Sequence, residues 1–228
     1  MRSRVQGDSV IVGWKTKRKE KLRDYRLFYA EGSASDGVRV IWEEIGLAYE
    51  LIQSTIDRGK PPPPEQLEIN PNGWIPVLMY GDHGIYECAA ITIFLCDRHP
   101  EANLAPKLNE PKRGLYLQTL VYFSNSVQTA FQTNYYPERF ADTQADELSA
   151  QRRGIRRLFE TWKVIDDQIG ENEWVLGESF SAVDIYLFML TTWLKTSRGH
   201  PTTDEFPNVK LIADGAMSRP STQLVYSR

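Results

Sequence analysis

Residues 25–53, which read YRLFYAEGSASDGVRVIWEEIGLAYELIQ, decide the fold of this chain. The runs Tyr25–Tyr29 and Tyr49–Gln53 are rich in aromatic and aliphatic residues, as short strands are. Between them, apolar residues recur at helical spacing from the turn Gly32–Ser35 to Gly46. A crossover helix of this length joins parallel strands. The stretch therefore predicts a βαβ unit.

A second unit follows after a proline-rich loop. The run Lys60–Pro64 contains four consecutive prolines and favours a stiff loop. Ile75–Met79 and Gly84–Tyr86 have the pattern of two short strands, and the brief turn between them predicts an antiparallel hairpin. Apolar residues then recur at helical spacing over Glu87–Arg98. The expected order is βαβ, loop, ββα.

The remainder of the chain carries helical patterns without strand signals. Pro100–Pro111 contains three prolines, which mark a linker. Ser181-Ala182-Val183-Asp184 has the form of a capping box at a helix start. Helical windows are expected at Lys112–Thr133, Asp142–Ile169, Ala182–Lys195 and Val209–Met217.

These patterns predict an α/β domain followed by an all-α domain. Four segments are expected, namely a basic extension at 1–24, a βαβ–ββα domain at 25–104, a linker at 105–111 and a helical domain at 112–228. The extension carries eight Lys/Arg against three Asp/Glu. Because it precedes the first expected strand and lacks sustained apolar periodicity, we expect it to be dispensable for folding and for ligand binding.

Composition excludes several classes of protein. Among the 228 residues, 41% are hydrophobic and 25% charged, which is typical of a globular chain. No run approaches the roughly 20 apolar residues of a membrane helix. The net charge is −3 despite the basic extension, so a nucleic-acid-binding face is not expected.

The cysteines and histidines give no sign of a disulfide or a metal site. Cys88 and Cys96 lie about 12 Å apart along one expected helix, which is beyond disulfide reach. No cysteine or histidine spacing typical of zinc binding occurs, so no metal is expected. Without a disulfide framework or a secretory signal, we expect a cytoplasmic protein.

Five short landmarks occur in order along the chain. They are Asn70–Leu78, Tyr86–Ile91, Asn103–Pro106, Ser181–Asp184 and Arg219–Pro220. Together with the expected element order, these landmarks resemble the cytosolic glutathione transferase superfamily over residues 25–219. The resemblance implies a thioredoxin-like N-terminal domain followed by a helical-bundle C-terminal domain.

The resemblance also implies a glutathione site in the first domain. Ile75 would pair with the peptide through its backbone, next to a cis bond at Pro76. Glu87 would accept from the γ-glutamyl ammonium, while the amides of the following helix start would bind the carboxylate. Cys88 stands where the family normally has serine, so one hydrogen bond is lost or weakened. Alternatively, Glu87 is a first-turn acid that the helix dipole stabilises.

Two serines are candidates for stabilising the glutathione thiolate. Ser33 aligns with the activating serine of the serine-type members of the family, and its hydroxyl would donate to the sulfur. Ser35 is the second candidate, but it also fits an ordinary N-cap, and a third alternative is that neither acts. Ala34 takes the place of the cysteine of bacterial cysteine-type members, so chemistry through a mixed disulfide is disfavoured.

The helical domain would then hold an electrophile. Aromatic and polar residues on its helices are candidates for lining an apolar cleft, among them Tyr122, Ser126 and Trp193. The sequence thus predicts a homodimeric transferase that conjugates glutathione to a hydrophobic or aromatic electrophile, with no cofactor beyond this co-substrate. Two alternatives are a glutathione-dependent lyase, dehalogenase or isomerase, and a noncatalytic binding protein with the same fold.

Overall fold

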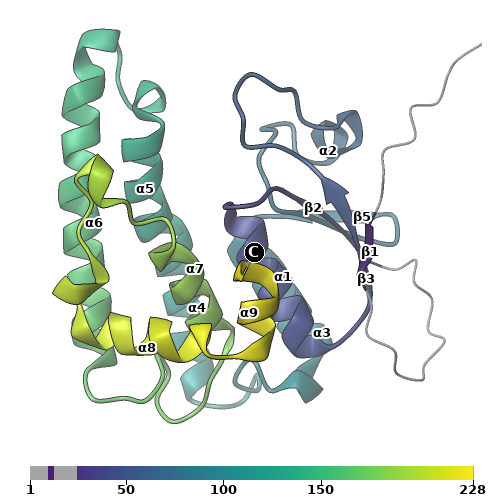
Figure 1. Ribbon diagram of the computed structural model, residues 1–228. Coiled ribbons are helices and arrows are strands. Elements are labelled where there is room, and N and C mark those ends of the chain that lie inside the picture. The colour runs from purple at the N-terminus through teal and green to yellow at the C-terminus, as the bar shows by residue number, and fades with distance from the viewer. Residues whose placement is uncertain (1–9, 13–24, 228) are drawn as a thin grey trace, which may run out of the picture. The chain divides into compact units, whose positions relative to one another are not determined.

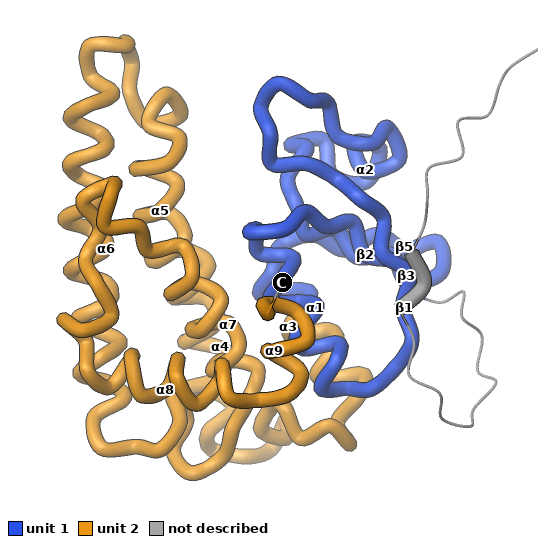
Figure 2. The backbone as a smooth tube through the Cα atoms, viewed as in Figure 1, with its two compact units in different colours: residues 1–91 blue, residues 92–228 orange. Residues whose placement is uncertain are grey.

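The structure is a computed structural model that describes residues 10–12 and 25–227 (Figure 1). The chain forms two compact units, residues 1–91 and residues 92–228 (Figure 2). The units divide inside helix α3 (Cys88–Arg98), whereas the sequence placed the boundary after residue 104. Residues 92–104 group with the helical unit, where the backbone N–H of Ala182 donates to the carbonyl of Leu104 at 2.8 Å.

Unit 1 is built on a five-stranded sheet in the order β1-β3-β2-β4-β5. Strand β2 (Tyr25–Tyr29) runs parallel to β3 (Tyr49–Gln53), with Leu27 opposite Leu51, which confirms the predicted βαβ unit. Strand β4 (Val77–Tyr80) pairs antiparallel with both β2 and β5 (His83–Tyr86). The predicted hairpin is therefore confirmed.

Helix α1 (Ala34–Ile45) forms because its apolar residues lie on one face. Val38, Ile41 and Trp42 are fully or almost fully buried, and the Trp42 ring packs on Tyr25 with ring centroids 4.5 Å apart. Gly46 ends the helix at φ +76°, a left-handed conformation that glycine adopts without a Cβ penalty. This helix holds the turn that follows β2.

Two elements of unit 1 were missed by sequence analysis. Strand β1 (Val10–Val12) pairs antiparallel with the outer edge of β3, so the expectation that the first strand begins at Tyr25 was wrong. The rest of the expected extension lies outside the described residues. Helix α2 (Pro64–Ile69) begins at the end of the proline run, where a proline at the first helical position is favoured.

Unit 2 is helical. It contains α4 (Lys112–Tyr122), α5 (Gln128–Tyr135), α6 (Glu147–Ile169), α7 (Ala182–Thr191), α8 (Pro207–Met217) and α9 (Pro220–Tyr226). A π-helical stretch, Phe123–Val127, joins α4 to α5. Short 3₁₀ turns lie at Pro100–Ala102, Pro137–Arg139, Gln144–Asp146, Thr196–Arg198 and Thr203–Glu205. None of the helices described is long and apolar enough to span a membrane.

Helix α7 is the centre of unit 2 and is buried along almost its whole length. The predicted capping box at its start is confirmed, since Asp184 accepts from the backbone N–H of Ser181 at 2.7 Å. The same carboxylate accepts from the N–H of Val175 at 2.8 Å. Burial nevertheless raises the pKa of Asp184 to about 6, because loss of water outweighs these donors.

Candidate functional site

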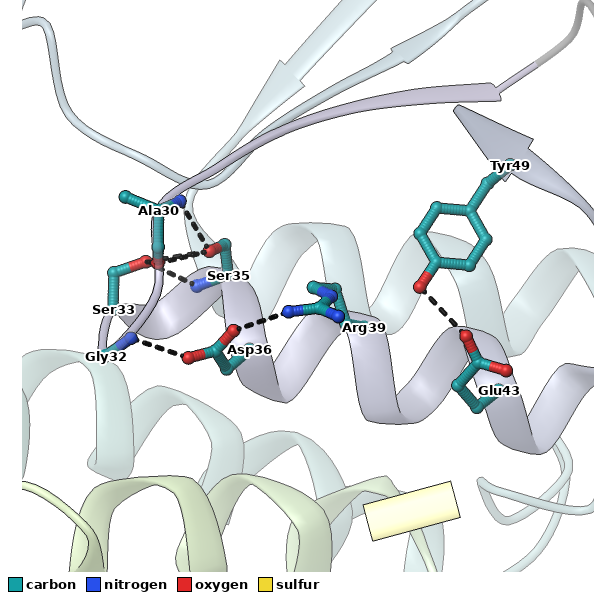
Figure 3. Close-up of polar contacts among 8 residues, drawn as sticks. All are labelled: Ala30, Gly32, Ser33, Ser35, Asp36, Arg39, Glu43 and Tyr49. Atoms are coloured by element: carbon teal, nitrogen blue, oxygen red, sulfur yellow. Dashed lines mark hydrogen bonds and ion pairs between the residues drawn. The ribbon is translucent and has the colours of Figure 1, made fainter. Parts of the chain in front are cut away.

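The turn between β2 and α1 is closed by its own side chains (Figure 3). Ser33 is the N-cap of α1, and its Oγ accepts from the N–H of Ser35 at 3.1 Å. Its hydroxyl also lies 2.7 Å from the carbonyl of Ala30, to which it donates. The alternative interpretation of Ser35 as the N-cap was therefore wrong, because the helix begins at Ala34.

Ser35 lies in the first turn of α1 and is more deeply buried than Ser33. It has no exposed surface, whereas Ser33 keeps 7%. The Oγ of Ser35 accepts from the N–H of Ala30 at 3.2 Å and lies 3.1 Å from the Ala30 carbonyl. The two hydroxyl oxygens are 2.7 Å apart, and because Ser33 donates its one hydrogen to the Ala30 carbonyl, Ser35 is the donor between them. Both candidate serines are buried, and of the two only Ser33 keeps any exposed surface.

A buried ion pair supports this turn from below, and sequence analysis missed it. Asp36 accepts from the N–H of Gly32 at 2.7 Å and from the guanidinium of Arg39 at 3.1 Å (Figure 3). Burial raises the pKa of Asp36, although the Gly32 N–H and Arg39 act in the opposite direction. The available signal was an acid in the first helical turn with an arginine three residues later, a spacing that places both on one helix face.

The segment before β4 has the cis bond that the family resemblance implied. The Ile75–Pro76 bond is cis, and Pro76 is buried while Ile75 is half-buried. Asn70 donates from its side-chain amide to the carbonyl of Trp74 at 3.0 Å. The segment that carries the backbone of Ile75 is thus held by side-chain hydrogen bonds from the end of α2.

Glu87 lies at the start of α3 in an uncommon backbone conformation. Its φ is +74°, a left-handed value that costs a non-glycine residue about 1–3 kcal/mol. The backbone still begins the helix, because the carbonyl of Glu87 accepts from the N–H of Ile91 at 2.9 Å. Its side chain is exposed and makes no hydrogen bond or ion pair within the described part of the chain. Strain of this kind is typical of ligand sites.

Cys88 follows Glu87 and turns inward. Its thiol is buried and lies 3.7 Å from the carbonyl of Ala34, to which it can donate weakly. This contact brings the start of α3 beside the first turn of α1. The positive ends of two helix dipoles therefore lie close together in unit 1, an arrangement that favours an anion.

The three residues expected to bind an electrophile lie in unit 2 in different surroundings. Tyr122 is half-buried, and desolvation raises its pKa, while Arg157 and Glu160 act on it with opposite signs. Ser126 is half-buried in the π-helical stretch. Trp193 packs edge-on against Phe131, with ring centroids 5.5 Å apart. Within the described residues, no hydrogen bond or ring contact joins these three side chains.

Other reactive side chains of unit 2 are engaged in the fold. His200 is buried, its Nδ1 accepts from the N–H of Lys195 at 3.1 Å, and its Nε2 lies 2.9 Å from Oδ1 of Asn134. Burial lowers the pKa of His200, which favours the neutral ring. Cys96 is buried, and its pKa is raised to about 12. In the part of the chain that the structure describes, no three His, Cys, Asp or Glu side chains are grouped to hold a metal.

Comparison with known proteins agrees with this arrangement. Residues 27–103 match the model of the glutathione S-transferase N-terminal domain, and residues 146–211 match that of the C-terminal domain. The GST-like protein YncG of Escherichia coli (strain K12) is 30% identical over 162 residues, which is 70% of this chain and 76% of YncG. This chain belongs to the glutathione S-transferase family.

Solved structures of the family share the fold. A glutathione transferase homologue from Sulfitobacter, solved with bound glutathione, has a TM-score of 0.81 at 23% identity and covers 90% of this chain and 98% of its own. A sphingomonad glutathione S-transferase in complex with glutathione has a TM-score of 0.76 at 21% identity, covering 89% and 97%. This family member therefore has the thioredoxin-like and helical domains that the sequence predicted.

Proposed function

We propose that this family member binds glutathione in unit 1, stabilises its thiolate and adds it to a hydrophobic or aromatic electrophile. The observation that carries the proposal is Glu87, a strained and exposed carboxylate at the start of α3. An exposed acid needs no left-handed backbone for stability, so a ligand is the better reason for the strain.

The γ-glutamyl end and the cysteinyl part of glutathione are bound by different groups in this proposal. The carboxylate of Glu87 accepts from the γ-glutamyl ammonium, and the backbone amides of the first turn of α3 receive the γ-glutamyl carboxylate. The backbone of Ile75 pairs with the cysteinyl part as an added strand would. Because the Cys88 thiol lies at the Ala34 carbonyl, only its backbone contributes to the ligand.

Ser33 is the group that we assign to the thiol. Its hydroxyl would turn from the Ala30 carbonyl to the sulfur, and the Ser35 hydroxyl, 3.1 Å from that carbonyl, would then satisfy it alone. The donated hydrogen bond and the dipole of α1 both favour the thiolate, so the pKa of the thiol falls from about 8.5. Ala34 leaves no cysteine for a mixed disulfide, which favours addition to carbon over thiol transfer.

The electrophile would bind through the helical unit, with Tyr122, Ser126 and Trp193 as its candidate contacts. Their half-buried side chains offer aromatic surface and two hydroxyl groups, those of Tyr122 and Ser126, which suit a mainly apolar ligand. Catalysis would rest on thiolate stabilisation, with glutathione as the only co-substrate. We place this activity in the cytoplasm.

A noncatalytic binding protein is the second candidate function. It is favoured by the Ser33 hydroxyl, which is committed to the turn, and by cysteine in place of serine at residue 88. Such a protein would bind glutathione without lowering the pKa of its thiol. A lyase, dehalogenase or isomerase would share the thiolate and differ only in its electrophile.

Three measurements separate these functions. Calorimetry of the full chain with glutathione tests binding, and the absence of heat would contradict every glutathione-dependent proposal. The ultraviolet absorbance of the bound thiolate against pH then distinguishes an enzyme from a binding protein. A panel of chloroaromatic, enone and epoxide electrophiles separates conjugation from the lyase, dehalogenase and isomerase reactions.

We also propose a homodimer, because the small core of the α/β unit gains stability from additional buried surface. Light scattering measures the mass directly. A mass of 26.2 kDa at micromolar concentrations, which is that of one chain, would contradict the proposal.

A further inference from the structure

One buried amide of unit 1 belongs neither to the turn between β2 and α1 nor to the start of α3. Gln66 is the only residue of α2 that is buried, and it has no exposed surface. Such a helix position ordinarily carries an apolar side chain, because a buried amide loses its water and needs protein partners. Its partners therefore indicate what Gln66 does.

Both polar atoms of the Gln66 side-chain amide make hydrogen bonds. Its Oε1 accepts from the hydroxyl of Ser54 at 2.5 Å, and its Nε2 donates to the carbonyl of Gly73 at 2.9 Å. Ser54 follows β3 directly, and its N–H donates to the carbonyl of Tyr29 at the end of β2 at 2.7 Å. A continuous chain of hydrogen bonds thus runs from the end of β2, through Gln66, to the segment before β4.

The segment whose carbonyls accept these hydrogen bonds, Gly73–Trp74, directly precedes Ile75. Gln66 binds the carbonyl of Gly73, and Asn70 binds the carbonyl of Trp74, the next one along the chain. In a trans peptide the C=O and the N–H point in opposite directions, and the Trp74–Ile75 bond is trans. Because the Trp74 carbonyl is turned toward the side chain of Asn70, the N–H of Ile75 points away from it.

We propose that Gln66 is a positioning residue for glutathione. It fixes the peptide plane after Gly73 and thereby holds, together with Asn70, the Ile75 backbone in the orientation that pairs with the cysteinyl part of the ligand. This inference rests on the proposed function, in which the Ile75 backbone binds glutathione. Gln66 itself does not touch the ligand; it acts through the two residues that precede Ile75.

The main test replaces Gln66 by methionine, which keeps the length of the side chain and removes both hydrogen bonds. Calorimetry with S-methylglutathione avoids titration of the thiol. Gln66→Met should bind it about ten-fold more weakly than the parent, which corresponds to a loss of about 1.4 kcal/mol. Tyr49→Phe is the matched control, because it removes a hydrogen bond of 3.0 Å to Glu43 in the same unit. Its affinity should equal that of the parent.

Gln66→Glu supplies a readout that a purely structural role would not change. A carboxyl group can accept from Ser54 at any pH, but it donates to the Gly73 carbonyl only when protonated. Burial raises the pKa of such a group. The dissociation constant of Gln66→Glu relative to the parent should therefore fall as the pH is lowered from about 8 to about 6. The relative constant of Gln66→Met should stay level.

The outcomes are distinguishable. If the parent does not bind S-methylglutathione or glutathione, the proposed function and this inference both fail. If the parent binds and Gln66→Met binds equally well, only the positioning role is overturned. Equal losses in Gln66→Met and Tyr49→Phe would overturn it too, because they would reflect a general loosening of unit 1. If Gln66→Met does not fold, Ser54→Ala decides, with an expected loss of about three-fold and an unchanged affinity as the contrary result.

Discussion

The helices α1 and α3 begin beside each other but in opposite ways. At the start of α1, the side chains of Ser33, Ser35 and Asp36 bind the backbone of their own turn. At the start of α3, Glu87 has a left-handed backbone and a carboxylate that makes no hydrogen bond or ion pair within the described residues. The first start is closed by the protein's own side chains, whereas we propose that a ligand occupies the second.

This difference separates stability from binding within one site. A closed helix start satisfies its own amides and contributes to the free energy of folding. An open one keeps amides and charge available and costs stability, which a bound anion can return. Substitutions at the α1 start should therefore change unfolding most, and substitutions at the α3 start should change affinity most.

Breaking the ion pair under the closed start should have the largest effect. Arg39→Met leaves the buried Asp36 carboxylate without its counter-charge, and we expect the free energy of unfolding to fall by about 3–5 kcal/mol in urea. The double variant Asp36→Asn/Arg39→Met removes both charges and keeps an acceptor for the Gly32 N–H. It should recover most of this loss, because no uncompensated charge remains. A double variant no more stable than Arg39→Met would show that charge pairing is not what Arg39 contributes.

The open start is tested by Glu87→Gln. Loss of a charged hydrogen bond to the glutathione ammonium should weaken binding by about 1.5–3 kcal/mol in calorimetry. Unfolding should change by less than about 0.5 kcal/mol, because the side chain is exposed and makes no ion pair among the described residues. Glu68→Gln, which removes an exposed charge from α2, is the control for the net charge of the unit. Equal affinities of Glu87→Gln and Glu68→Gln would remove Glu87 from the site.

The sequence predicted those features that depend on residues close together in the chain. The strands at Tyr25–Tyr29 and Tyr49–Gln53 and the capping box at Ser181 are encoded within a few residues, whereas the cis bond at Pro76 was implied by the family resemblance. The left-handed backbone of Glu87 could not be predicted, because glutamate has no preference for it. The surrounding structure imposes that conformation.

Features that depend on distant partners were missed. Strand β1 needs the free edge of β3, because three β-branched residues are too few to predict a strand by themselves. The burial of Gln66 depends on Ser54 and Gly73, which its sequence neighbourhood does not specify. The assignment of Ser35 rather than Ser33 as a possible N-cap failed for another reason. Either serine can precede the apolar stripe of α1, and only the backbone distinguishes them.

Ser33 should affect both stability and ligand chemistry, because it caps α1 and is our candidate donor to the glutathione thiolate. Ser33→Ala should lower the free energy of unfolding by about 1 kcal/mol, whereas Ser33→Gly should lower it by only a few tenths, about 0.3 kcal/mol. Both should raise the pKa of bound glutathione thiol equally if the hydroxyl stabilises the thiolate. The measurement is thiolate absorbance against pH, with Ser35→Ala alongside. A shift only in Ser35→Ala would transfer the role to Ser35, and no shift in any variant would leave the helix dipole as the activator.

The smallest effect is expected at β1, which lies at the edge of the sheet beyond β3. Removing residues 1–24 deletes a three-residue strand, and its few backbone hydrogen bonds are partly offset by the entropy of ordering the chain. The truncation should therefore lower the free energy of unfolding by about 1 kcal/mol or less, whereas the sequence alone predicted no change. Ile11→Pro in the full chain should reproduce the loss, because proline interrupts a strand ladder.

Glutathione affinity should stay the same in both, since Ser33 follows β2, Ile75 precedes β4, and within the described residues β1 pairs with β3 alone. A fall in affinity would mean that the loss of β1 changes the ligand site through the sheet. Equal stability of the parent, the truncated chain and Ile11→Pro would restore the expectation that the segment is dispensable.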